Sequence, residues 1–166
     1  QRQLDLDEPS LRYLQDHLVQ SSVVFPGAGY SELMLSAGRA LRPDAGMLRL
    51  TSVQYRSAMV LGRAVKRTCQ VVLTPIAESD SVAYQAQILS WPESQDRSSA
   101  ELHAEGVIGW QPQLGLRPHV DVEQLRKSCA LSQDPTEIYR TLSADGVHYG
   151  PSFQAVKEFS VQQSGG

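Results

Sequence analysis

Cysteine, long apolar runs and an excess of positive charge are scarce or missing in this sequence of 166 residues. The two cysteines, Cys69 and Cys129, are too few for a disulfide scaffold and favour a reduced, cytoplasmic protein. No apolar run reaches about 18 residues, so we expect no membrane-spanning helix, and the polar first residues do not form a signal peptide. A net charge of −3 argues against a nucleic-acid partner, which normally requires a basic face. The length suits one domain, or one domain and a fragment.

The most informative stretch runs from residue 16 to residue 41. It begins with an acid–histidine pair, Asp16 and His17, and continues through a short apolar run to Pro26 and Gly27. Proline is favoured in the first turn of a helix, where its missing N–H group leaves no bond unmade. We therefore predict a helix that begins at Pro26-Gly27 and is buried over most of its surface. Its apolar or small residues recur at helical spacing, at Tyr30, Leu33, Met34, Ala37, Gly38 and Leu41.

Strand-like runs lie on both sides of this helix. They span residues 18–25, 48–55, 65–74, 82–91 and 100–110, and the segments between the later runs are rich in proline, serine and aspartate. Consecutive strands on short loops indicate an antiparallel sheet. One buried helix with such a sheet predicts the α+β class, with the sheet wrapped around the central helix.

The last third of the chain changes character. Residues 111–120 contain two prolines and a glycine, which is typical of a linker. Helical patterns follow at 122–130 and 135–144, the second with Asp134 as its predicted cap. A final strand-like run covers 155–161.

Two motifs in this sequence resemble those of polyketide synthase and fatty acid synthase dehydratase domains. His17 to Pro26 resembles the pattern His-x-x-x-Gly-x-x-x-x-Pro, with Ser21 in place of the glycine, which leaves the local backbone geometry open. Residues 149–153 (Tyr-Gly-Pro-Ser-Phe) resemble Tyr-Gly-Pro-x-Phe, and the two motifs occur in the same order as in that family. The strand-like run at 102–106 (Leu-His-Ala-Glu-Gly) is similar as well.

The resemblance implies a hot-dog fold, here the first half of a double hot dog. It also implies a division of the chain into three parts. These are an N-terminal hot-dog fold at 1–112, a linker with a short helix at 113–134, and, at 135–166, a helix with the truncated start of a second hot dog.

The activity that the resemblance implies is that of a hydro-lyase in a modular polyketide synthase. Such a dehydratase removes water from a β-hydroxyacyl thioester and leaves an enoyl thioester. The substrate is carried on the phosphopantetheine arm of an acyl carrier protein, and no cofactor or metal is implied. The expected partners are the acyl carrier protein, the other domains of the same synthase and the second hot-dog half, with a homodimer as a possibility.

His17 is the candidate catalytic base, because neutral imidazole can take up a proton near pH 7. Its alternative role is that of a packed histidine bonded to backbone. Pro26 and Gly27 are candidate substrate-binding residues, since free N–H groups at a helix start stabilise negative charge on a thioester oxygen. Alternatively, they only start the helix. Tyr149 and Pro151 are candidates from the second motif, which could also be a plain turn.

Other chemistry-bearing residues receive structural roles. We expect Asp16 to be solvated, since neighbours in a strand point to opposite faces, and Phe153 to be core. The remaining histidines (His103, His119 and His148) match no metal-ligand spacing.

Dehydration also needs an acid, which the family supplies as an aspartate downstream of Tyr-Gly-Pro. No aspartate follows Phe153 here, so we expect the acid to be missing from this chain and the chain to be part of a larger domain. Three alternatives stay open: an enoyl double-bond isomerase or cyclising domain, a non-catalytic scaffold module, and a free-standing thioesterase-type hot dog, which the second motif disfavours.

Overall fold

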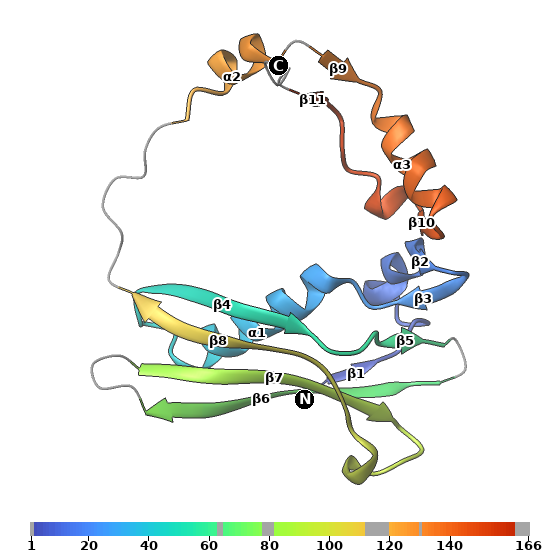
Figure 1. Ribbon diagram of the computed structural model, residues 1–166. Coiled ribbons are helices and arrows are strands. Elements are labelled where there is room, and N and C mark those ends of the chain that lie inside the picture. Colours follow the sequence, from blue (N-terminus) through green and yellow to red (C-terminus); the bar gives the residue numbers. More distant parts are fainter. Residues whose placement is uncertain (1, 63–64, 78–81, 112–119, 130, 162–166) are drawn as a thin grey trace.

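The computed structural model describes residues 2–62, 65–77, 82–111, 120–129 and 131–161. A five-stranded antiparallel sheet of order β1-β6-β7-β8-β4 forms its largest layer (Figure 1). The bounds of its strands are Arg2–Leu4 (β1), Arg67–Ala77 (β6), Val82–Pro92 (β7), Glu101–Gln111 (β8) and Met47–Tyr55 (β4). The four longer strands agree with the predicted runs within a few residues.

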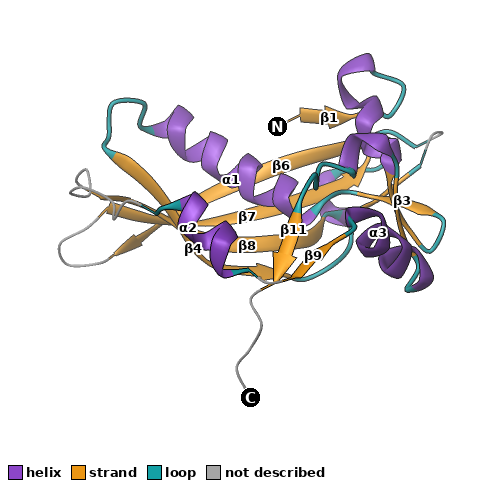
Figure 2. Cartoon of the chain, turned by 90° about the horizontal axis from the view of Figure 1, so that it is seen from above, coloured by secondary structure: helices purple, strands orange, loops and turns teal. Residues whose placement is uncertain are grey.

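A single long helix, α1 (Gly27–Leu41), crosses this sheet and packs against β4, β6, β7 and β8 (Figure 2). Its buried residues Tyr30, Met34 and Gly38 face a core that the sheet supplies from β7 and β8. A Cβ atom on Gly38 would lie only 3.0–3.1 Å from Leu48 and Ile108. This helix–sheet arrangement confirms the predicted α+β class and the prediction of a sheet around one helix.

The burial of α1 is narrower than predicted. Glu32, Ser36 and Arg39 lie on an exposed face, and the side chain of Leu41 is exposed as well. The five-stranded sheet packs against one side of the helix, so the opposite side of α1 keeps its contact with solvent.

A smaller antiparallel sheet, of order β10-β2-β3-β5, lies at the start of α1. The 3-10 helix η1 (Pro9–Asp16) leads into it, with Glu8 at its cap position. Its strands are β2 (His17–Val19), β3 (Ser22–Val24), β5 (Val60–Leu61) and β10 (Val147–Tyr149).

The single strand predicted at 18–25 is therefore wrong. Gln20 and Ser21 both have positive φ angles, of 47° and 68°, and turn the chain back on itself between β2 and β3. Two consecutive left-handed residues are typical of the tight turn of a hairpin. The motif position that is glycine in the resembling family is thus a left-handed position here, and Ser21 adopts it.

The loop predicted to begin at Pro75 also differs, because β6 continues to Ala77. Beyond residue 69, β6 pairs with β7 alone, since β1 pairs only with residues 67–69. Pro75 therefore lies on an edge, where a missing N–H group breaks no ladder bond.

The C-terminal elements stand above β2 and β4 in Figure 1. They include both predicted helices and the predicted cap, since Asp134 accepts the Thr136 amide. The predicted linker lies largely outside the described residues, at 112–119, as does His119. These elements are α2 (Val122–Ser128), β9 (Leu131–Gln133), α3 (Pro135–Ala144), η3 (Pro151–Phe153) and β11 (Phe159–Val161), with β9 and β11 paired.

Candidate active site

His17 begins β2 directly after η1, and one hydrogen bond defines its tautomer. Its Nδ1 atom lies 2.8 Å from the carbonyl oxygen of Val24 in the neighbouring strand. A carbonyl oxygen only accepts hydrogen bonds, so Nδ1 carries the proton and donates it. In neutral His17 the other ring nitrogen, Nε2, therefore holds a free lone pair. No hydrogen bond joins Nε2 to any described residue, which leaves it available as a base.

The N-terminus of α1 lies beside this histidine. Pro26 occupies the N-cap position, and Gly27 is the first helical residue. The first amides of a helix have no partner within the helix and carry its positive partial charge. Tyr55 lies over Gly27, with its hydroxyl donating to the Gly27 carbonyl oxygen at 3.4 Å and its ring 3.5 Å from the place where a Cβ would be. The aromatic side chain of Tyr55 thus covers the first residue of α1.

His17 and Gly27 line one cleft of about 320 Å³. Its walls are largely apolar and aromatic, and none of the described residues that line it is an aspartate or glutamate. The single cation in the lining, Arg56, is held by Glu105, which accepts its Nε–H at 2.8 Å. The lining comprises His17, Val24, Phe25, Gly27, Tyr30, Tyr55, Arg56, Ser57 and Ala58.

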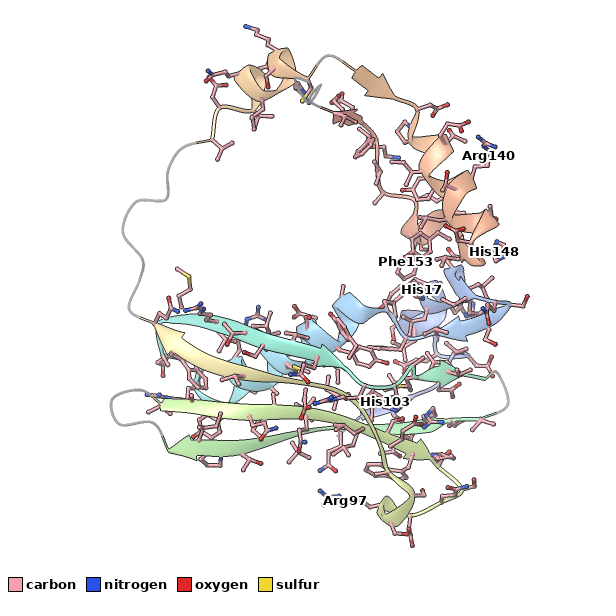
Figure 3. All side chains as sticks on the ribbon, in the orientation of Figure 1. His17, Arg97, His103, Arg140, His148 and Phe153 are labelled. Atoms are coloured by element: carbon pink, nitrogen blue, oxygen red, sulfur yellow. The ribbon has the colours of Figure 1, made fainter. Side chains whose placement is uncertain are left out.

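Tyr149 reaches the same histidine from the other end of the sequence. Strand β10 pairs with β2 so that Tyr149 lies directly opposite His17, and the two ring centres are 5.2 Å apart. The Phe153 ring is 5.1 Å from the His17 ring. Figure 3 shows the His17 and Phe153 side chains where the C-terminal elements meet β2. Phe153 is only partly buried and contacts the candidate base, so its predicted place in the core is wrong.

The remaining candidates lie outside the cleft lining. Pro26 is buried at the N-cap, and Pro151 is exposed in the first position of η3. Tyr149 contacts His17 but is not among the lining residues of the cleft. A substrate-binding role for these three residues stays a prediction.

Sequence reasoning missed several residues of this site. Tyr55 and Tyr30 were treated as strand and helix positions, although the spacing of Tyr30 already placed it on the buried face. Burial raises the pKa of Tyr30 to about 12, and its hydroxyl oxygen accepts the Met59 amide at 3.1 Å. Met59 in turn accepts the amide of Phe25 at 2.9 Å, which ties the cleft wall to the start of α1.

Asp16 is the second omission: it keeps its predicted contact with solvent, but its bond to the distant Ser152 was not predicted. Its carboxylate accepts the backbone amide of Ser152 at 2.9 Å. Hydrogen bonds from the side chain and then the backbone of Ser152 hold the pKa of Asp16 below its usual value. No local sequence pattern connects two residues this far apart.

The other described histidines do not line the cleft. His103 is fully buried and bonded to Ser90, while His148 is exposed and bonded to Ser143. Within the described part of the chain, no three His, Cys, Asp or Glu side chains gather as metal ligands would. None of its helices is long and apolar enough to cross a membrane.

Comparisons with known proteins agree with the motifs. A family model described as polyketide synthase dehydratase domain matches residues 2–90, and one described as polyketide synthase dehydratase N-terminal domain matches residues 117–165. Polyketide synthase ThaG of Burkholderia thailandensis is 30% identical over 154 residues, which cover 87% of this chain and 3% of that protein. The highly reducing polyketide synthase sdnO of Sordaria araneosa is 25% identical over 177 residues, covering 91% of this chain and 6% of that protein.

Solved structures show the same relationship at the level of the fold. The dehydratase domain from the CurK module of curacin polyketide synthase is 27% identical, with a TM-score of 0.83 over 97% of this chain. The dehydratase domain from the terminal module of the rifamycin polyketide synthase is 29% identical, with a TM-score of 0.80. The chain spans 53% and 54% of these two structures, which is about half of each. The chain has the hot-dog fold and belongs to the polyketide synthase dehydratase domain family.

Proposed function

We propose that this chain forms part of a site that dehydrates a β-hydroxyacyl thioester. The observation that carries the proposal is that one apolar cleft is lined both by His17, whose Nε2 has no hydrogen bond to a described residue, and by Gly27 at the N-terminus of α1. A base and an amide-rich helix end are the two groups that proton abstraction beside a thioester carbonyl requires.

In the proposed reaction, Nε2 of His17 takes the proton from the carbon between the thioester carbonyl and the hydroxyl-bearing carbon. The C–H electron pair forms the new double bond, and the hydroxyl group leaves with its bonding pair. The positive end of α1 at Gly27 stabilises the negative charge that develops on the thioester oxygen. The bond from Nδ1 to Val24 holds the imidazole in the tautomer that the step needs and supports the imidazolium that results.

The departing hydroxyl needs a proton, and the described cleft residues include no carboxylic acid. Two of the solved relatives are inactive variants of the CurK dehydratase, one with an aspartate changed to asparagine and one with a histidine changed to phenylalanine. That pair supports a mechanism with one histidine and one aspartate. We propose that the acid comes from the part of the dehydratase fold that those structures contain beyond the region matched by this chain.

The proposed setting is a multidomain polyketide synthase. The substrate would reach the cleft on the phosphopantetheine arm of an acyl carrier protein, with no other cofactor. The further predictions are a cytoplasmic location, neighbouring synthase domains as partners, and pairing as a homodimer.

The test is mass spectrometry of a β-hydroxyacyl carrier protein after incubation with the longest native chain that contains this sequence. We expect loss of one water, and His17→Ala should slow it by a factor of about 10² to 10⁴, the usual contribution of a general base. His148→Ala is the matched control, because His148 is exposed and bonded only to Ser143 among described residues. Normal water loss by His17→Ala would overturn the assignment of the base. Double-bond migration without water loss would indicate an isomerase, and neither reaction in a well-folded protein would indicate a scaffold.

A further inference from the structure

Asp16 joins the two sequence motifs through two hydrogen bonds. Its carboxylate oxygen Oδ2 accepts the Ser152 amide at 2.9 Å, and its backbone carbonyl accepts the Gly150 amide at 2.8 Å. Asp16 ends η1 and is covalently attached to His17, whereas Gly150 and Ser152 follow strand β10 directly. Asp16, the residue before the candidate base, therefore holds the turn that follows Tyr149.

The fit between the two segments leaves no room for a side chain at position 150. A Cβ atom on Gly150 would lie 2.5 Å from the carboxyl carbon of Asp16 and 2.8 Å from its Cβ atom. Real Cβ atoms do not approach other atoms so closely, so the turn and the carboxylate would have to separate. The glycine is required here for close approach rather than for an unusual φ angle.

The turn that Asp16 holds carries two of the aromatic rings around His17. Tyr149 precedes it and Phe153 ends it, and their rings lie 5.2 Å and 5.1 Å from the imidazole ring. The two rings also contact each other, with centres 5.8 Å apart. The imidazole has only one hydrogen bond to described residues, through Nδ1, so contacts with these two rings add to the restriction of its motion.

We propose that Asp16 is a positioning residue, whose bonds to Gly150 and Ser152 clamp Tyr149 and Phe153 against the ring of His17. Its catalytic consequence rests on the proposed function, in which His17 is the base. The carboxylate acts through the turn and does not touch the substrate. Loss of the clamp should misdirect Nε2, and a displacement of about 1 Å can lower the rate of a reaction by about 10²-fold.

The chain contains a close chemical match for this contact at a remote place. Asp96 accepts the amide of Ser98 at 2.9 Å and also its hydroxyl, and it caps the short turn η2 (Arg97–Ser99). Both aspartates thus bind the amide of a serine in a 3-10 turn. Asp96 does so within its own loop, at the far end of the molecule from His17, next to the labelled Arg97 in Figure 3. Asp96→Ala is the matched control for Asp16→Ala.

The experiment compares the wild-type protein, Asp16→Ala and Asp96→Ala in the longest native chain that contains this sequence. Peptide mass spectrometry measures backbone hydrogen exchange at residues 149–154 and exchange at the Cε1–H of each histidine, and the water-loss assay gives kcat and KM. In Asp16→Ala we expect exchange at 149–154 to rise by about 10-fold or more, because a bond to a charged acceptor is lost. Cε1 exchange of His17 should rise while that of His103 stays unchanged, and kcat should fall more than KM rises. Asp96→Ala should change none of these.

Two further variants separate the clamp from general loss of structure. Gly150→Ala leaves Asp16 in place but forces the segments apart, so it should reproduce every effect of Asp16→Ala. Asp16→Asn keeps an oxygen that accepts the Ser152 amide, so it should retain most of the wild-type behaviour.

The proposal is overturned if His17 exchange and kcat in Asp16→Ala match those in Asp96→Ala, or if Gly150→Ala is silent. If wild-type protein loses no water, the proposed function fails, yet the exchange measurements still decide whether the clamp exists. If water loss is normal in Asp16→Ala while exchange rises, the clamp exists but does not position a catalytic group, and that part of the proposal is wrong.

Discussion

Single residues near the β2–β3 turn determine where His17 lies. Gln20 and Ser21 take left-handed φ angles, and this turn brings Val24 alongside His17 so that its carbonyl receives the Nδ1 proton. A left-handed conformation costs an L-residue with a side chain about 1 kcal/mol or more, whereas glycine adopts it freely. The serine at position 21 therefore stores a small strain beside the candidate site.

Changing Ser21 to glycine should relieve this strain. We expect Ser21→Gly to raise the free energy of unfolding by about 0.5–1 kcal/mol, measured by urea denaturation. The same substitution one residue later, Ser22→Gly, should lower it by about the same amount, because Ser22 lies in strand β3 and glycine weakens a strand. Equal signs for the two variants would contradict the turn assigned here.

The residues that sequence reasoning identified are those within a short motif. His17 and Gly27 were predicted together because ten residues, 17–26, carry both the histidine and the start of the helix, and they do line one cleft. The contacts of Asp16 and Phe153 were missed because their partners lie at the other end of the chain. Local periodicity carries no information on a pairing between positions 16 and 152.

Among the elements, length explains which were predictable. The strands β4, β6, β7 and β8 have nine or more residues each, enough for alternation to stand out. Strands β1, β5, β9 and β10 have two or three residues and show no measurable period. Two of these, β5 and β10, complete the sheet that holds His17, so this sheet could not be predicted, although the predictable elements α1 and β4 supply Gly27, Tyr30 and Tyr55 to the cleft.

A buried chain of hydrogen bonds connects three strands to the wall of the cleft. Arg67 on β6 donates to the hydroxyl oxygen of Ser90 on β7 at 2.9 Å, and Ser90 lies 2.8 Å from Nε2 of His103 on β8. The Nδ1–H of His103 donates to the carbonyl of Ser57 at 3.2 Å, so in neutral His103 the Nε2 atom accepts the Ser90 hydroxyl proton. Ser57 lines the cleft, and His103 thus supports it from behind.

This network predicts how stability depends on pH. Burial is the main cause that lowers the pKa of His103 below its ordinary 6.5. At a pH between the lowered pKa of folded His103 and the ordinary value of 6.5, the unfolded chain binds a proton that the folded chain does not. The free energy of unfolding therefore increases with pH in this range. We expect the free energy of unfolding to be constant above about pH 6.5 with respect to this group and to fall as the pH drops below it.

Urea denaturation at a series of pH values from about 5 to 8 measures this dependence. His103→Gln should flatten the slope below pH 6.5, whereas His148→Gln, at an exposed position, should keep it. An unchanged slope in His103→Gln would assign the dependence to another group.

For the molecule as a whole, the buried side chains are concentrated around α1 and the five-stranded sheet. The elements after residue 120 contribute no residue to the buried core as described. The β9–β11 pair has three residues in each strand, and two-stranded sheets of this size are marginal on their own.

Amide hydrogen exchange should therefore be graded along the chain. We expect the slowest exchange in β6, β7 and β8, with opening free energies near that of global unfolding, and exchange close to that of an unfolded peptide in α2, β9 and β11. Exchange in β10 should be intermediate, because it pairs with β2 and is held by Asp16. Equal protection of β11 and β7 would show that the C-terminal elements are part of the same cooperative unit.

The pairing of β10 with β2 also sets the order in which the molecule can be completed. The hairpin of β2 and β3 is local and can form early, but the partner of His17 in the ladder, Tyr149, lies 132 positions further along the chain. Contacts of such high sequence separation form slowly because a long loop must close first. During synthesis at about 5–20 residues per second, the strand that carries His17 waits many seconds for its neighbour to leave the ribosome. Until then β2 has one unpaired edge, a surface on which a folding chain can mispair and which a chaperone can recognise.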